Sequence, residues 1–297
     1  MTDTLGDVQA PMIVALGNES SGKSSMLERL MMLPILPKGD SMCTRLPIII
    51  RLRHACSPQL PILEVRDLNG KVSHSKRVPM LDLRAAVHAE MAAVVQQEAE
   101  DLKNQGLLGT RPGVSTQKQI AIALSSPSLP NMDLLDLPGL KTIAGSDEAD
   151  DTPARTWELA ERMVEAYRDR AIFLTTVHSA MAPTQALGVQ MLRNRGLLDR
   201  AVGVFTMVDE LTRPMQRRML MRIDGQVGDA VPLEPNGWVA TMTEPVGSDR
   251  DEAACVGEEL NSAFTFYSAG KGEGKRKNRL NGLESLRTQA INEATFF

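Results

Sequence analysis

The sequence predicts an α/β fold with a mostly parallel central sheet and helices on both faces. Short apolar runs of strand length alternate with segments whose apolar residues recur at helical spacing, as βαβ units require. The first run, residues 12–16, passes through a Gly- and Ser-rich loop into the first helical segment, which is one such unit. The composition agrees, because 297 residues with 42% hydrophobic and 24% charged side chains can bury a full core.

The first elements are a strand, a helix and a second strand. Residues 12–16 (MIVAL) form an apolar run that ends at Gly17, which is typical of a buried strand entering a turn. Residues 23–33 place their apolar side chains on one face and are followed by Pro34, which predicts a helix and its end. Residues 46–52 (LPIIIRL) predict the next strand.

A hairpin and a long helix are expected next. The pair Asn69-Gly70 is a strong hairpin signal, and it separates two strands at 60–65 and 71–78. Residues 83–105 are rich in Ala, Glu and Gln and predict a helix.

The second half of the chain continues the alternation of strands and helices. Strands are expected at 118–124, 132–137, 171–177, 201–207 and 238–242. Helices are expected from Pro153 to Tyr167, over 184–195 before Gly196, and around 214–222. A last helix is expected where Leu283, Leu286, Ala290 and Ile291 share one face. No repeat and no dividing linker is visible, so a single domain over 1–297 is expected.

Composition excludes several classes of function. A net charge of −4 and 3% aromatic residues argue against a general nucleic-acid binder, which needs basic clusters and rings for stacking. The three cysteines form no CxxC pair and the four histidines no metal-binding pattern, which favours a reducing, cytoplasmic location. No apolar stretch approaches the ~20 residues of a membrane span, and the first residues lack the features of a secretory signal.

Residues 17–24 (GNESSGKS) fit the phosphate-loop pattern GxxxxGK[ST] between a strand and a helix. In such a loop the glycines allow backbone N–H groups to face phosphate oxygens, and the following helix N-terminus favours an anion. Lys23 is expected to reach the β- and γ-phosphates and Ser24 to ligate Mg²⁺. The expected phosphate-binding residues are Gly17, Glu19, Ser20, Ser21, Gly22, Lys23, Ser24 and Ser25. The alternative is a Gly/Ser loop without a ligand.

A second motif is expected to complete the phosphate and metal site. In the segment DLPG (136–139), an apolar strand ends at Asp136, which can hold Mg²⁺ through water, and Gly139 can offer its N–H to a γ-phosphate. Thr44 lies between the two motifs in a loop that can close over Mg²⁺. The predicted metal ligands are therefore Ser24, Thr44 and Asp136.

Base selection is expected at the end of a later strand. Asp209 follows the apolar run VFTMV, and a carboxylate there can accept two N–H bonds from guanine. The usual guanine motif has Lys where this chain has Met207. The alternative is that Asp209 is the N-cap of the next helix.

Together these motifs resemble those of dynamin-family large GTPases. The matching segments follow the family order: GNESSGKSS (17–25), LPKGDSMCTRLPIIIRL (36–52), DLPG (136–139), TMVD (206–209) and GWVATMTEP (237–245). A terminal pattern at Asn281, Gly282 and Leu286 is similar to the helix that ends the family's GTPase domain. The resemblance covers about residues 10–292.

The resemblance implies a P-loop GTPase fold with extended dynamin-type insertions, without a stalk or a membrane-binding domain in these 297 residues. It implies GTP or GDP with Mg²⁺ as ligands and is compatible with a monovalent cation as a further cofactor. It also implies a homodimer formed through the nucleotide face, or pairing with other chains of the family, that stimulates hydrolysis. Membrane remodelling or fission, with peripheral contact to an organelle membrane, rests on the resemblance alone.

The resemblance also assigns roles to individual residues. Catalytic roles fall on Glu19, Ser20, Lys23, Thr44 and Gly139, and base contacts on Thr206, Met207, Asp209 and Thr243. Because Leu140 follows Gly139, the Gln that orients water in Ras-like enzymes is absent, and the family's P-loop Gln and Ser match Glu19 and Ser20.

Four departures from the family pattern favour a second interpretation. They are Glu19 in place of Gln, Met207 in place of Lys, Thr243 and Glu244 in place of Asn-Arg, and Thr212 in place of Asp. An ionised Glu19 repels a γ-phosphate and only accepts hydrogen bonds. The alternative functions are a nucleotide-dependent switch or pseudo-GTPase with weak guanine recognition, and a P-loop kinase or ATPase.

Overall fold

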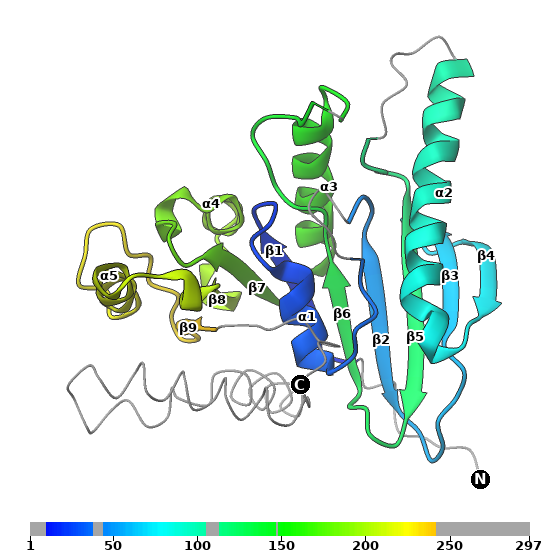
Figure 1. Ribbon diagram of the computed structural model, residues 1–297, viewed down its shortest axis with the longest axis horizontal. Helices are drawn as coiled ribbons and strands as arrows, with labels where there is room; N and C mark the ends of the chain where they lie inside the picture. The colour runs from blue at the N-terminus through cyan, green and yellow to red at the C-terminus, as the bar shows by residue number, and fades with distance from the viewer. Residues whose placement is uncertain (1–9, 38–43, 105–112, 147, 242–297) are drawn as a thin grey trace.

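The computed structural model describes residues 10–37, 44–104, 113–146 and 148–241. Within these residues nine strands form one sheet, in the order β4-β3-β5-β2-β6-β1-β7-β8-β9 (Figure 1). The strands are β1 Met12–Gly17, β2 Ile48–His54, β3 Ile62–Asp67, β4 Val72–Arg77, β5 Lys118–Ser126, β6 Met132–Asp136, β7 Ala171–His178, β8 Ala201–Thr206 and β9 Trp238–Ala240. The expected strands are therefore all present, with ends shifted by a few residues.

The sheet is mostly parallel, as the alternation of elements predicts. The run β6-β1-β7-β8-β9 is parallel throughout, and β2 is parallel to β5. The antiparallel pairs are β2 with β6, β3 with β5, and the hairpin β3–β4 across Asn69-Gly70. The parallel half brings the carboxyl ends of β1, β6, β7 and β8 to one edge, where open α/β sheets bind ligands.

Five α-helices cover the two faces of the sheet in the described residues. They are α1 Lys23–Met31, α2 Leu83–Asn104, α3 Thr152–Tyr167, α4 Leu187–Asn194 and α5 Arg213–Ile223. Buried side chains of α1 and α2 pack with Ile13 and Ala15 of β1, whereas those of α3, α4 and α5 pack with the alternate β1 residues Met12, Val14 and Leu16. The prediction of helices on both faces is confirmed, and Figure 1 shows α1 and α2 in front of the sheet and α3 behind it.

Two helices are shorter than the sequence pattern predicts. The helix expected over 23–33 ends at Met31, because Met32 adopts a left-handed conformation with φ of 56°. The helix expected over 184–195 begins at Leu187, because Pro183–Gln185 forms a separate 3₁₀ turn before it. The final helix expected near residues 283–291 lies outside the described residues. In the part of the chain that is described, no helix is long and apolar enough to cross a bilayer.

Candidate functional site

The loop between β1 and α1 forms a compact turn at the edge where the parallel strands end. Gly22 has φ of +81°, a conformation that side chains disfavour, and it is the N-cap residue of α1. The Ser21 N–H donates to the Asn18 carbonyl at 3.3 Å, and the Ser21 hydroxyl lies 2.7 Å from the Thr176 hydroxyl of β7. Ser20 is exposed with φ of 57°, whereas Ser25 is half-buried in the first turn of α1.

The Lys23 ammonium lies inside this loop. Its Nζ donates to the carbonyl oxygens of Asn18 at 2.9 Å and Gly17 at 3.3 Å. Burial lowers the pKa of Lys23 to about 8, although the nearby carboxylates of Asp136 and Glu19 act in the opposite direction. A buried cation held by carbonyl groups is suited to binding an anion that enters the loop.

Two of the predicted metal ligands converge on the third, the carboxylate of Asp136. Asp136, at the end of β6, accepts hydrogen bonds at Oδ2 from Ser24 Oγ at 2.7 Å and from Thr44 Oγ1 at 3.1 Å. Asp136 is fully buried, and burial raises the pKa of its carboxyl group despite the nearby Lys23 and these two hydrogen bonds. Thus residues from α1, β6 and the segment before β2 meet at one point.

This cluster fits a magnesium ion. Two hydroxyls and a carboxylate are hard oxygen donors of the kind that Mg²⁺ prefers, and Mg²⁺ keeps several water ligands. The second oxygen of Asp136, Oδ1, is buried and has no hydrogen-bond partner among the described residues. A buried unpaired oxygen is costly, so a ligand at that atom would relieve the cost.

The DLPG segment lies directly against the phosphate loop. A Cβ atom added to Gly139 would lie 2.6 Å from the Glu19 Cα, so a side chain has no space there. The Glu19 N–H donates to the Leu140 carbonyl at 2.9 Å, and the Leu140 N–H donates to the Gly17 carbonyl at 3.0 Å. These backbone hydrogen bonds fix the positions of Glu19 and Gly139 relative to each other.

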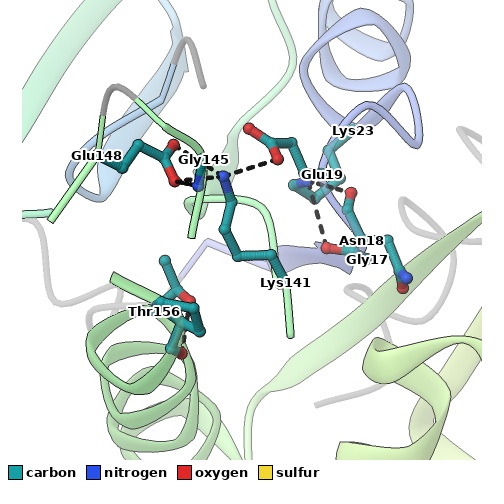
Figure 2. Close-up of polar contacts among 9 residues, drawn as sticks. Gly17, Asn18, Glu19, Lys23, Lys141, Gly145, Glu148 and Thr156 are labelled. Atoms are coloured by element: carbon teal, nitrogen blue, oxygen red, sulfur yellow. Dashed lines mark hydrogen bonds and ion pairs between the residues drawn. The ribbon is translucent and has the colours of Figure 1, made fainter. Parts of the chain in front are cut away.

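Glu19 is part of an ionic cluster that the motifs do not indicate (Figure 2). Lys141 Nζ lies 2.7 Å from Glu19 Oε2 and 2.7 Å from Glu148 Oε1, and it occupies the space between the two carboxylates. Glu148 also accepts the Gly145 N–H at 2.9 Å. Glu19 is therefore paired, whereas the sequence suggests an isolated negative charge in the loop. The only signal for Lys141 in the sequence is a basic residue two positions after Gly139.

The expected base-reading residues lie at the end of β8. Thr206 is fully buried, and its hydroxyl donates to the Ser21 carbonyl at 3.0 Å, so the end of β8 is hydrogen-bonded to the phosphate loop. Met207 adopts a left-handed conformation with φ of 56°, and its carbonyl accepts a hydrogen bond from Ser179 at 2.8 Å. Thr243 lies outside the described residues.

The alternative interpretation of Asp209 as a helix N-cap is wrong. Asp209 is exposed in the 3₁₀ turn Val208–Glu210, and the N-cap residue of α5 is Thr212. Its carboxylate is therefore not needed to cap that helix. The structure thus brings the phosphate and metal residues into one cluster, and places Asp209 on the turn that follows β8.

The comparisons with known proteins agree with this arrangement. The family model described as "Dynamin family" matches residues 13–208. "Interferon-induced GTP-binding protein Mx1" of Mus musculus is 31% identical over 222 residues, which cover 72% of this chain and 31% of that protein. "Dynamin-related protein 3A" of Arabidopsis thaliana is 27% identical over 76% of this chain and 26% of its own length. The chain therefore spans about a quarter to a third of these relatives.

Proposed function

The chain belongs to the dynamin family and carries a dynamin-type GTPase domain, and on that premise we propose that it binds GTP with Mg²⁺ and hydrolyses it to GDP and phosphate. The observation that carries this proposal is the convergence of Ser24 and Thr44 on the buried Asp136, behind a loop that holds Lys23. One carboxylate, two hydroxyls and an ammonium are the groups that a magnesium–triphosphate complex requires.

Each residue of the cluster has a separate task. The backbone N–H groups of residues 17–24 and the Lys23 ammonium bind the β- and γ-phosphates. Ser24, Thr44 and Asp136 would hold Mg²⁺, and the ion would offset the negative charge that develops on the phosphates. Gly139 offers its backbone N–H to the γ-phosphate.

The hydrolysis step requires an oriented water molecule. The water oxygen forms a bond to the γ-phosphorus while the bond from that phosphorus to the bridging oxygen breaks. The bridging oxygen keeps the electron pair and leaves on GDP, and the proton lost by the water goes to the released phosphate or to solvent. Glu19 and Ser20, within the phosphate loop, orient the water by hydrogen bonds.

Guanine recognition falls to the turn after β8. Asp209 is exposed there, so its carboxylate is available to two N–H groups of the base. Thr206 acts indirectly, because its hydroxyl is used to hold the Ser21 carbonyl. Met207 contributes contact area without the charge of a lysine.

Assembly and location are extensions of the same proposal. We propose that two copies pair through the nucleotide face and that pairing stimulates hydrolysis, by analogy with the family. By the same analogy we place the chain in the cytoplasm, acting in membrane remodelling or fission at the surface of a membrane.

The experiment that tests the proposal measures phosphate release and nucleotide affinity with GTP and ATP side by side. We expect release from GTP that requires Mg²⁺, and little from ATP. Asp136→Asn should lower turnover about 10²-fold or more, because it removes the charge of the metal cluster. Ser128→Ala, an exposed hydroxyl on the turn between β5 and β6, is the control and should behave as wild type.

The same measurement tests the second candidate, a nucleotide-dependent switch. Met207 favours it, because a methionine at this position cannot supply the charged contact of a guanine motif. Tight GTP binding without turnover at any protein concentration would establish the switch and reject the hydrolase. Equal use of ATP, or no binding of either nucleotide, would reject both.

A further inference from the structure

Glu19 presents a chemical difficulty for the proposed hydrolysis. Its backbone is fixed by the hydrogen bond to Leu140, so the side chain extends from the loop to which we assign the γ-phosphate. A carboxylate and a γ-phosphate are both anions, and their repulsion is strong at short range in a partly desolvated site. A neutral side chain would avoid this cost, so a carboxylate needs a nearby positive charge.

Lys141 supplies that charge. Its Nζ lies 2.7 Å from Glu19 Oε2, and the Lys141 side chain is only 8% exposed. Burial tends to lower the pKa of Lys141, but the hydrogen bonds to Glu148 and Glu19 outweigh that effect and raise the pKa overall. The ammonium is therefore charged at neutral pH and lies beside the Glu19 carboxylate.

Lys141 is itself held from the side opposite Glu19. Glu148 accepts from the ammonium at 2.7 and 2.8 Å through its two oxygens, and the Glu148 side chain is 3% exposed. The Gly145 N–H fixes Glu148 in turn. Figure 2 shows the order Glu148, Lys141, Glu19, with Lys23 beyond Glu19, so that the charges alternate in sign toward the phosphate loop.

One oxygen of Glu19 is used in this arrangement and the other is not. Oε2 pairs with Lys141, whereas Oε1 makes no hydrogen bond to any residue that the structure describes. The Glu19 side chain is 32% exposed, so Oε1 can be reached by water. An ionised carboxylate oxygen is a strong acceptor for a water O–H.

Resting on the GTPase function proposed above, we propose that Lys141 is a positioning residue for hydrolysis. It offsets the charge of Glu19 against the γ-phosphate, and it holds Oε2 so that Oε1 accepts a hydrogen bond from the attacking water. Lys141 acts through Glu19 and touches neither the nucleotide nor the water. The competing interpretation is that Lys141 only neutralises the buried Glu148.

A cycle of four proteins tests the proposal: wild type, Lys141→Met, Glu19→Gln and the double variant. For each protein we would measure kcat for GTP and the affinities for GDP and for guanylyl imidodiphosphate, which keeps a γ-phosphate. We expect Lys141→Met alone to weaken the triphosphate analogue by about tenfold, to leave GDP unchanged, and to lower kcat. Within the Glu19→Gln background, Lys141→Met should alter the affinity for guanylyl imidodiphosphate and kcat by less than about twofold each.

The cycle separates the two roles of Lys141, because Lys141→Met deprives Glu148 of its partner in both backgrounds. Equal losses in both would show that Lys141 serves Glu148 alone and would overturn the proposal. If Lys141→Met unfolds, the comparison of Glu148→Gln with Lys141→Met/Glu148→Gln repeats the test without a buried unpaired carboxylate. Lys141→Arg should restore most of kcat. Wild type that neither binds nor hydrolyses GTP would instead reject the proposed function itself.

Discussion

At the level of one residue, Lys23 shows how burial in the phosphate loop disfavours a positive charge. Its ammonium is buried with two carbonyl oxygens as acceptors, and burial lowers its pKa from 10.5 to about 8. A bound polyphosphate places negative charge beside the ammonium and raises the pKa again. At a pH above about 8, binding must therefore be accompanied by proton uptake.

This linkage predicts a dependence of binding on pH. At roughly pH 9 we expect GDP binding to take up close to one proton, and the affinity to fall as pH rises from about 8 to 10. Well below pH 8 the lysine is charged in both the free and the bound protein, so the uptake disappears. Calorimetry in two buffers with different ionisation enthalpies measures the uptake. The Lys23→Arg variant, which keeps its charge, should take up fewer protons than wild type, because only the titration of the base itself remains. A binding enthalpy independent of buffer in wild type would contradict the prediction.

The phosphate residues could be predicted because their chemistry is local in sequence. The pattern of Gly17, Gly22, Lys23 and Ser24 is contiguous, and Asp136 directly ends an apolar strand. Lys141 could not be assigned in this way. Its partner Glu19 lies far away in the chain, and the contact depends on the alignment of β1 with β6 and on the backbone hydrogen bonds at Leu140.

At the level of elements, Thr206 connects β8 to the phosphate loop. Its hydroxyl donates to the Ser21 carbonyl at 3.0 Å, and the Ser21 hydroxyl lies 2.7 Å from the Thr176 hydroxyl of β7. A Cβ added to Gly22 would lie 3.3 Å from the Thr206 side chain. The ends of β7 and β8 therefore support the loop that follows β1.

We predict that Thr206→Val acts on the loop and not on base choice. The substitution keeps the shape but removes a buried donor, so the free energy of unfolding should fall by about 1–2 kcal/mol. Affinity for GDP should fall severalfold, while the ratio of GTP to ATP affinity stays unchanged. Chemical denaturation and nucleotide titration measure the two effects, with Ser128→Ala as the control. A loss of preference for GTP would show that Thr206 contacts the base.

Strands and helices were predictable from periodicity, whereas their pairing was not. The hairpin of β3 and β4 follows from Asn69-Gly70, because its turn type is encoded locally. The antiparallel pairing of β2 with β6 has no such signal, since these strands are separated in the chain by β3, β4, α2 and β5. The early end of α1 at Met31 depends on the left-handed Met32, a conformation that is unusual for methionine.

At the level of the whole molecule, the order of the sheet decides what lies on the nucleotide face. Because β1 lies between β6 and β7, the loops after β1 and β6 meet there, as the ion pair of Lys141 with Glu19 and the backbone hydrogen bonds of Leu140 show. Ser20 follows Glu19 directly, and Ile143 lies two residues after Lys141 in the chain. Ile143 is 81% exposed. A single exposed apolar side chain is common on protein surfaces, so the reason for choosing Ile143 is its closeness in the chain to Lys141, which pairs with Glu19 of the phosphate loop.

We therefore predict that Ile143 contributes to pairing of two copies through the nucleotide face. GTP turnover per molecule should rise with protein concentration by roughly tenfold or more. Pairing is expected to fix the groups that orient the attacking water, and such groups contribute about 10²-fold to a rate. Ile143→Ser should flatten that dependence.

The matched control is Leu81→Ser, which removes an equally apolar side chain that is 97% exposed, in the 3₁₀ turn Met80–Asp82 before α2. That turn precedes α2, which covers the β5 side of the sheet. Loss of the Leu81 side chain should therefore leave the dependence of turnover on protein concentration unchanged. Turnover per molecule that stays constant over the whole concentration range in wild type would contradict stimulation by pairing. Equal effects of the two substitutions would contradict a specific contact at Ile143, because a general loss of apolar surface would then explain both.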